Sequence, residues 1–247
     1  MRFFFKYLGP VMVVSLISIT FAGMGPYRYQ EKKSPQEILS IAAQNGARVM
    51  SALRNYSCDS ELTFQTVNVG DVVTGAYRRL SKITYDKSGN RRERILEEKS
   101  SLPRDTYIGS NAVNNLIQVY QFILTPEAVS RYEITYIGAE KVDELDTYVF
   151  DLRPSLKLPD PESSRDRYLK GRIWIDQEDL QVVKAAGEAV PEQSAHRTPK
   201  FETYFQNKDR YWFPAYTSAD DDIRSGHSVM RVIVKLRFTG YEARSGS

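Results

Sequence analysis

"GRIWIDQEDLQVVKA", residues 171–185, contains two short apolar runs on either side of a polar, acidic group at residues 176–179. Turn-forming residues between two aliphatic runs predict a β-hairpin. Because side chains alternate between the two faces of a strand, the pattern predicts one apolar face made of Ile173, Ile175, Leu180 and Val182. The same alternation places Trp174 with Arg172 and Asp176 on the polar face.

Alternating apolar and polar residues recur through most of the chain after Asn55 and predict further antiparallel strands. Residues 77–98 are expected to form two strands around a turn at 86–90, with the pairs Arg78–Arg79 and Arg91–Arg92 on solvated strand faces. Later strands are expected to carry their apolar side chains on one face, namely Tyr148, Phe150, Leu152, Phe201, Phe205, Val232, Val234, Leu236 and Phe238.

Two stretches have helical spacing instead. Residues 34–54 begin with Ser34 as a capping residue, Pro35 at the first helical position and Glu37 as the partner in a capping box. Apolar residues then recur every three or four positions, as they do in an amphipathic helix. Residues 110–124 have the same spacing and precede a second helix start at Thr125–Pro126. One curved sheet wrapped around these helices, without a second domain, is therefore the expected architecture.

The N-terminus is typical of a targeting segment. Arg2 and Lys6 precede an uncharged stretch that is mostly apolar, and Ala22 is a small residue at a plausible cleavage position. We expect a signal peptide at residues 1–22, a linker at 23–33, one domain at 34–243 and a tail at 244–247. An uncleaved anchor is the alternative, because about 20 uncharged residues approach the length of a membrane span.

Composition favours a globular, β-rich protein that does not bind nucleic acid. Aromatic residues make up 12% of the chain, and such side chains suit half-buried strands. Arg2 and Lys6 contribute two units of the formal net charge of +3, and no long basic run follows them. Cys58 has no second cysteine to pair with in the chain, so we expect it to be buried, with a bridge to another chain as the alternative.

No sequence motif indicates enzymatic chemistry. His196 and His227 stand alone in polar stretches, and zinc, P-loop, dinucleotide-binding and nucleophile-elbow motifs are absent. The run Asp220–Asp222 lacks an EF-hand frame and is expected to be a solvated turn. We therefore expect no catalytic residue, no metal and no cofactor, although plentiful carboxylates leave a glycosidase as a third alternative.

The order of these elements resembles a known family. An exported chain with an N-terminal amphipathic helix, long charged strands, an inserted helical segment and the late hairpin at 171–185 is similar to LolA-like and LolB-like lipoprotein carriers, and to the sensor domain of RseB/MucB. The segment "RYWFPAYTSADDD" at 210–222 also resembles a stretch of lipoprotein-sorting proteins. The resemblance covers residues 34–243. It implies a mainly β (α+β) fold, in which a strongly curved antiparallel sheet forms a half-open β-barrel with an N-terminal helix and a helical lid.

The function that this resemblance implies is non-enzymatic binding in the periplasm. A lipid or acylated lipoprotein would be the partner during outer-membrane lipoprotein sorting, and burying each methylene group of its acyl chains contributes about 0.8 kcal/mol. The alternative is an envelope sensor or interaction module that regulates a membrane-anchored protein. The protein is expected to be a monomer that is periplasmic or anchored to the inner membrane. Its hydrophobic cavity is predicted to be lined by Tyr148, Phe150, Leu152, Ile173, Ile175, Leu180, Val182, Phe201, Phe205, Val232, Val234, Leu236 and Phe238, unless these side chains form an ordinary packed core.

Overall fold

The computed structural model describes residues 33–68, 70–86, 90–102, 117, 119–155, 157–161, 163–164, 166–192, 199–225 and 228–244. The predicted signal peptide, most of the linker, both histidines and most of the predicted lid helix lie outside these residues. Ser34–Ser247 form one compact unit. Within the described ranges, no helix combines the length and apolar character that a membrane span requires.

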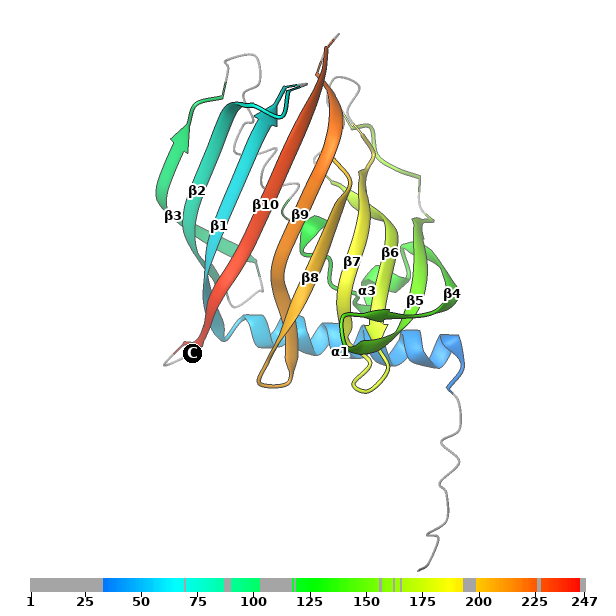
Figure 1. Cartoon of the computed structure of the whole chain (residues 1–247). Helices are drawn as coiled ribbons and strands as arrows, with labels where there is room; N and C mark the ends of the chain where they lie inside the picture. Colours follow the sequence, from blue (N-terminus) through cyan, green and yellow to red (C-terminus); the bar gives the residue numbers. More distant parts are fainter. Residues whose placement is uncertain are drawn as a thin grey trace, which may run out of the picture. The chain divides into compact units, whose positions relative to one another are not determined.

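The described residues form one antiparallel sheet of ten strands, in the order β3-β2-β1-β10-β9-β8-β7-β6-β5-β4 (Figure 1). The strands are β1 Tyr56–Val67, β2 Val73–Tyr85, β3 Arg91–Ser100, β4 Tyr132–Val142, β5 Leu145–Pro154, β6 Tyr168–Asp176, β7 Val182–Val190, β8 Phe201–Lys208, β9 Tyr211–Ser225 and β10 Ser228–Ala243. β3 and β4 are the two edges, so the sheet is not closed. The prediction of a mainly β fold with a curved, half-open sheet is confirmed.

The strand order forces one long connection. β3 and β4 follow each other in the chain but lie at opposite edges of the sheet, so the residues between them must cross it. This connection contains Ile117, Val119 and Tyr120, which are helical, and the short helix α3, Pro126–Val129, capped by Thr125. We call residues 119–129 the crossing segment. The predicted helix start at Thr125–Pro126 is confirmed.

Helix α1, Pro35–Leu53, confirms the prediction for residues 34–54. The capping box is present: the Glu37 backbone N–H donates to Ser34 Oγ over 3.3 Å, and the Ser34 backbone N–H donates to Glu37 Oε2 over 2.7 Å. α1 runs across the strands on one side of the sheet (Figure 1). We call that side the inner face and the opposite side the outer face. The side of α1 that packs in the main core holds Ile38, Ala42, Ala43, Val49, Ala52 and Leu53.

The hairpin at 171–185 forms as β6 and β7, but two details of the prediction are wrong. Leu180 lies in the turn with a φ of 53°, and not in a strand, although its side chain is buried in the main core. Trp174 is also buried, in a second cluster with Val142, Val149 and Val183. Neighbouring strands supply this outer-face cluster, so Trp174 is covered even though charged residues flank it in sequence.

Two predictions about charged residues are wrong as well. Arg79 and Arg91 are not on solvated faces, because their side chains are only 2% and 18% exposed. Neighbouring residues in a strand point to opposite faces, so one member of each arginine pair must point inward. Asp220–Asp222 belong to β9 and do not form a turn; Asp220 there accepts two hydrogen bonds from Arg231 on β10.

Candidate functional site

The inner face changes in character from one edge of the sheet to the other. The strand register places one residue of each strand in a row across it, from β3 to β4: Glu98, Arg79, Leu62, Leu236, Thr217, Thr203, Ala185, Ile173, Phe150 and Tyr136. The row begins with charged side chains, continues with aliphatic and hydroxyl side chains, and ends with aromatic ones. The inner face therefore has a polar end at β2 and β3 and an apolar remainder.

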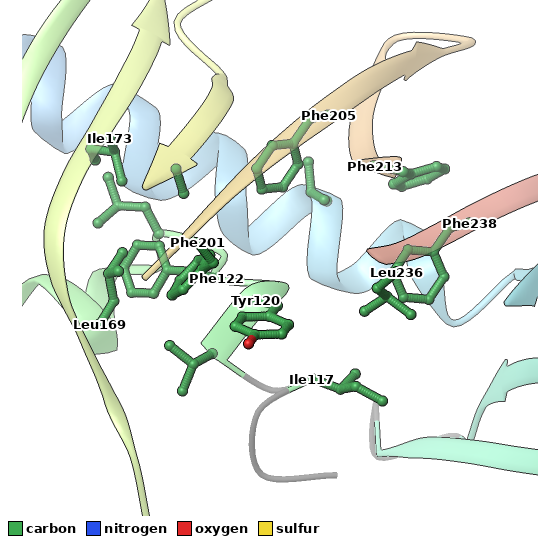
Figure 2. Close-up of a cluster of buried hydrophobic side chains, with 14 of the residues drawn as sticks. Ile117, Tyr120, Phe122, Leu169, Ile173, Phe201, Phe205, Phe213, Leu236 and Phe238 are labelled. Carbon is green, nitrogen blue, oxygen red and sulfur yellow. The ribbon is translucent and has the colours of Figure 1, made fainter. Parts of the chain in front are cut away.

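All thirteen predicted cavity residues lie in the main hydrophobic cluster on this face or pack against it. Tyr148 and Val182 are partly buried, and the others are buried. The same cluster contains residues of α1 and of the crossing segment, including Tyr120, Phe122 and Leu124. Figure 2 shows Tyr120, Phe122, Phe201 and Phe205 gathered in this cluster. The structure thus brings the predicted residues together, and their role as the wall of a ligand cavity stays a prediction.

α1 and the crossing segment together form the cover of the inner face, and they meet at Gly46. A Cβ atom on Gly46 would lie 1.8 Å from the carbonyl oxygen of Leu124, so only glycine permits this approach. A cavity of about 10 Å³ remains beside the contact, and its lining includes Val49, Phe205 and Trp212. This volume is close to the minimum for one water molecule. The cover therefore fills this part of the inner face almost completely.

Hydrogen bonds between residues far apart in sequence join the cover to β8 and to the β6–β7 turn. Thr203 Oγ1 on β8 donates to the carbonyl oxygen of Tyr120 over 2.7 Å. Asn45 Nδ2 on α1 donates to the carbonyl oxygens of Asp179 and Leu180, in the β6–β7 turn, over 3.0 and 3.1 Å. The core contacts of Figure 2 are otherwise made by apolar side chains. Such contacts are not directional, so hydrocarbon from another molecule can replace them.

The polar end of the inner face holds a largely buried ion network. Glu93 lies between two arginines, with its Oε1 3.3 Å from Arg79 Nε and its Oε2 3.0 Å from Arg91 Nη1. Burial alone would raise the pKa of the Glu93 carboxyl, but the positive charge of Arg91, the neighbouring Ser81 hydroxyl and the positive charge of Arg79 outweigh it and hold that pKa below its usual range. Nearby, Tyr77 donates a hydrogen bond to Glu98, and burial raises the pKa of Tyr77 to about 12.

Cys58 lies beside this network and is 1% exposed, which confirms the expectation of a buried thiol. Burial raises the pKa of its thiol to about 11. The thiolate is the reactive form of cysteine, so we expect the folded chain to resist alkylation by iodoacetamide at pH 8. The urea-unfolded chain should be alkylated readily. Mass spectrometry of both samples measures the difference, and fast labelling of the folded chain would contradict the burial of Cys58.

The sequence leaves two interpretations of Gly46, close packing or an imperfect helix, and sequence reasoning missed its partner Leu124. It also missed the inward position of Arg79, Arg91 and Glu93. A usable signal was present for the charged residues. In β2, Arg79 lies two positions after Tyr77 and four positions before Ile83. Even spacings place side chains on the same face of a strand, so all three share one face. The described residues contain no group of three or more His, Cys, Asp or Glu side chains placed as metal ligands would be.

Comparisons with known proteins give a family-model match and similar solved structures. A family model described as "Uncharacterized protein" matches residues 118–240. No curated protein matches the chain. The predicted resemblance to LolA-like and MucB proteins is confirmed, because both kinds of protein are among the similar solved structures.

One similar structure is a LolA superfamily protein from Nitrosomonas europaea, with 14% identity and a TM-score of 0.39 over 83% of this chain and 95% of that chain. Another is a putative outer membrane lipoprotein-sorting protein domain from Vibrio parahaemolyticus, with 13% identity and a TM-score of 0.41 over 85% and 93%. The MucA/MucB complex of Pseudomonas aeruginosa matches with 8% identity and a TM-score of 0.24 over 83% and 99%.

Proposed function

We propose that this protein is an exported, non-enzymatic binding protein that takes up the acyl chain of a lipid or lipoprotein between the inner face and its cover. The proposal extends to a periplasmic carrier role in outer-membrane lipoprotein sorting. The observation that carries it is the apolar part of the inner face of an unclosed sheet, covered by a helix and a crossing segment instead of a second sheet.

The free energy of burying hydrocarbon favours the entry of an acyl chain between the inner face and the cover. An acyl chain that enters between cover and sheet keeps both apolar surfaces away from water, and each methylene group it buries contributes about 0.8 kcal/mol. Among the described residues, the cavity beside Gly46 has a volume of only about 10 Å³, so at this place the cover must separate from β7 and β8 before a chain can enter. The proposed binding state is therefore more open than the state described above.

The two tryptophans of the chain provide a test. Trp212 lines the cavity beside Gly46 and also packs against the outer-face cluster, whereas Trp174 lies within that cluster and does not line the cavity. We expect a neutral monoacylglycerol to cause a saturable change in the fluorescence of the Trp174→Phe variant, whose remaining indole is Trp212. The Trp212→Phe variant should bind the same lipid with no change in fluorescence. Equal changes in both variants, or no saturable binding to the unsubstituted chain, would contradict the proposal.

A second candidate is a module that binds a membrane-anchored protein. The edge strands carry exposed apolar side chains, with Ile95 and Leu96 on β3 and Tyr136 and Ile137 on β4. Unpaired edges with apolar side chains are a common place for another chain to add a strand. Replacing Ile137 by lysine should abolish retention of a defined envelope protein while leaving lipid binding unchanged. Unchanged retention by the Ile137→Lys variant would count against β4 as the contact.

A further inference from the structure

One edge of the Arg91 guanidinium group is buried without an acceptor among the described residues. Nη1 of Arg91 donates to Glu93 Oε2 over 3.0 Å, which fixes the orientation of the group. Nε and Nη2, which form the opposite edge, have no hydrogen-bond partner. Buried N–H groups are almost always paired in folded proteins, so this edge indicates a binding position for an acceptor from outside the chain.

The same guanidinium edge binds carboxylates elsewhere in this protein. Arg231 donates through Nε and Nη2 to the two oxygens of Asp220, over 2.7 and 2.8 Å. Arg92, the neighbour of Arg91, uses the same two nitrogens for Asp86, over 3.1 and 2.8 Å. Two parallel N–H donors match the spacing of oxygens in a carboxylate or phosphate group. The ligand for Arg91 is therefore expected to be an oxyanion.

Neighbouring residues favour a small anion at this position. Ser81, on the same face of β2, is 2% exposed, and its hydroxyl group lies beside Glu93, where it helps to lower the pKa of that carboxyl. Arg79 adds a second guanidinium group on the other side of Glu93. Glu98, the next carboxylate on this face of β3, accepts a hydrogen bond from Tyr77. Donors from two strands thus lie close to the apolar core formed by Cys58, Leu62 and Ile83.

We propose that Arg91, with Arg79 and Ser81 beside it, binds the carboxylate or phosphate of an amphipathic ligand whose hydrocarbon chain occupies the apolar part of the inner face. This inference rests on the proposed function and narrows its ligand class to anionic lipids. Glu93 acts as a positioning residue, because it holds Arg91 through Nη1 and leaves the Nε–Nη2 edge for the ligand. The two nitrogens are buried, so the anion reaches them only in a state more open than this one.

The test compares lauric acid with lauryl alcohol, which share one hydrocarbon chain and differ in the anionic group. Calorimetric titration of the full chain at fixed ionic strength should give at least about 10-fold tighter binding of the acid, as expected for a charge-assisted bidentate pair. The Arg91→Met variant should bind both ligands equally. The matched control is Arg94→Met, which removes an exposed arginine from the other face of the same strand. It should keep the preference for the acid.

Each outcome decides between the two proposals. Equal binding of acid and alcohol by the unsubstituted chain overturns the anion site and leaves the proposed function intact. A preference that survives in Arg91→Met also overturns it, and this comparison of two ligands needs no assumption about the stability of the variant. Binding of neither ligand overturns the proposed function and, with it, the inference that rests on it. A thermal shift of the unsubstituted chain with inorganic phosphate alone, lost in Arg91→Met, would assign the site to a free anion and overturn the lipid assignment.

Discussion

Replacing Glu93 by glutamine is expected to lower the free energy of unfolding by about 3 kcal/mol, the cost of removing one partner from a buried ion pair. Glu93 contacts both Arg79 and Arg91, and its side chain is 13% exposed. Glutamine has nearly the same shape but no charge, so the two guanidinium groups lose the carboxylate that they share. Urea unfolding at pH 7, followed by circular dichroism, measures the loss.

The matched control is Glu97→Gln on the same strand. Glu97 pairs with Arg78 and Lys99, but it is 34% exposed, and water and salt screen such exposed pairs, so its removal should change stability much less. A loss in Glu93→Gln no larger than in Glu97→Gln would show that the buried network does not stabilise the fold.

The Glu93 contribution should also depend on pH. The pKa of this carboxyl is lower in the folded chain than in the unfolded chain, so its stabilising effect is complete above the unfolded value of about 4.3. It is lost as the pH falls through the folded pKa. The difference in stability between the unsubstituted chain and Glu93→Gln should therefore shrink progressively below about pH 5. A difference that is constant down to pH 3 would contradict the depressed pKa.

Replacing Gly46 by alanine is expected to destabilise the protein by about 2 kcal/mol, although the same change in an ordinary helix stabilises it by about 0.5–1 kcal/mol. The sign reverses because the new methyl group would overlap the backbone of Leu124, 1.8 Å away, and backbone atoms cannot rotate aside. α1 and the crossing segment must then separate. Thermal unfolding measures the loss, and the fluorescence of Trp212 reports whether the cover has moved.

The control for this substitution is Gln44→Ala, on the exposed side of α1, which should change stability by less than about 0.5 kcal/mol. A Gly46→Ala variant that is more stable than the unsubstituted chain would show that α1 and Leu124 are not in close contact. The same result would remove the argument that the cover fills the cavity.

Much of the fold could be predicted from local patterns. The capping box at Ser34 and the period-two alternation of the later strands are decided by residues within a few positions of each other, and the structure follows them. The predicted cavity residues gather in the main hydrophobic cluster for the same reason, because alternation alone places side chains such as Ile173 and Ile175 on one face. The order of residues over short stretches of the chain therefore determined which helices and strands form and which apolar side chains lie together on one face.

Tertiary packing decided what the alternation left open. The pairs Arg78–Arg79 and Arg91–Arg92 each required one inward side chain, but the pairing of β2 with β3 determined that Arg79 and Arg91 meet at Glu93. The burial of Trp174 depends on Val142, Val149 and Val183, which come from other strands.

The sequence by itself determined a curved antiparallel sheet with an N-terminal amphipathic helix, because hydrophobic periodicity and capping act over short distances along the chain. Only the tertiary structure decided that Gly46 contacts Leu124 and that a buried guanidinium edge of Arg91 lies on the inner face. The first feature is a contact between residues far apart in sequence, and the second depends on burial by other parts of the chain, so both depend on how the elements pack in three dimensions.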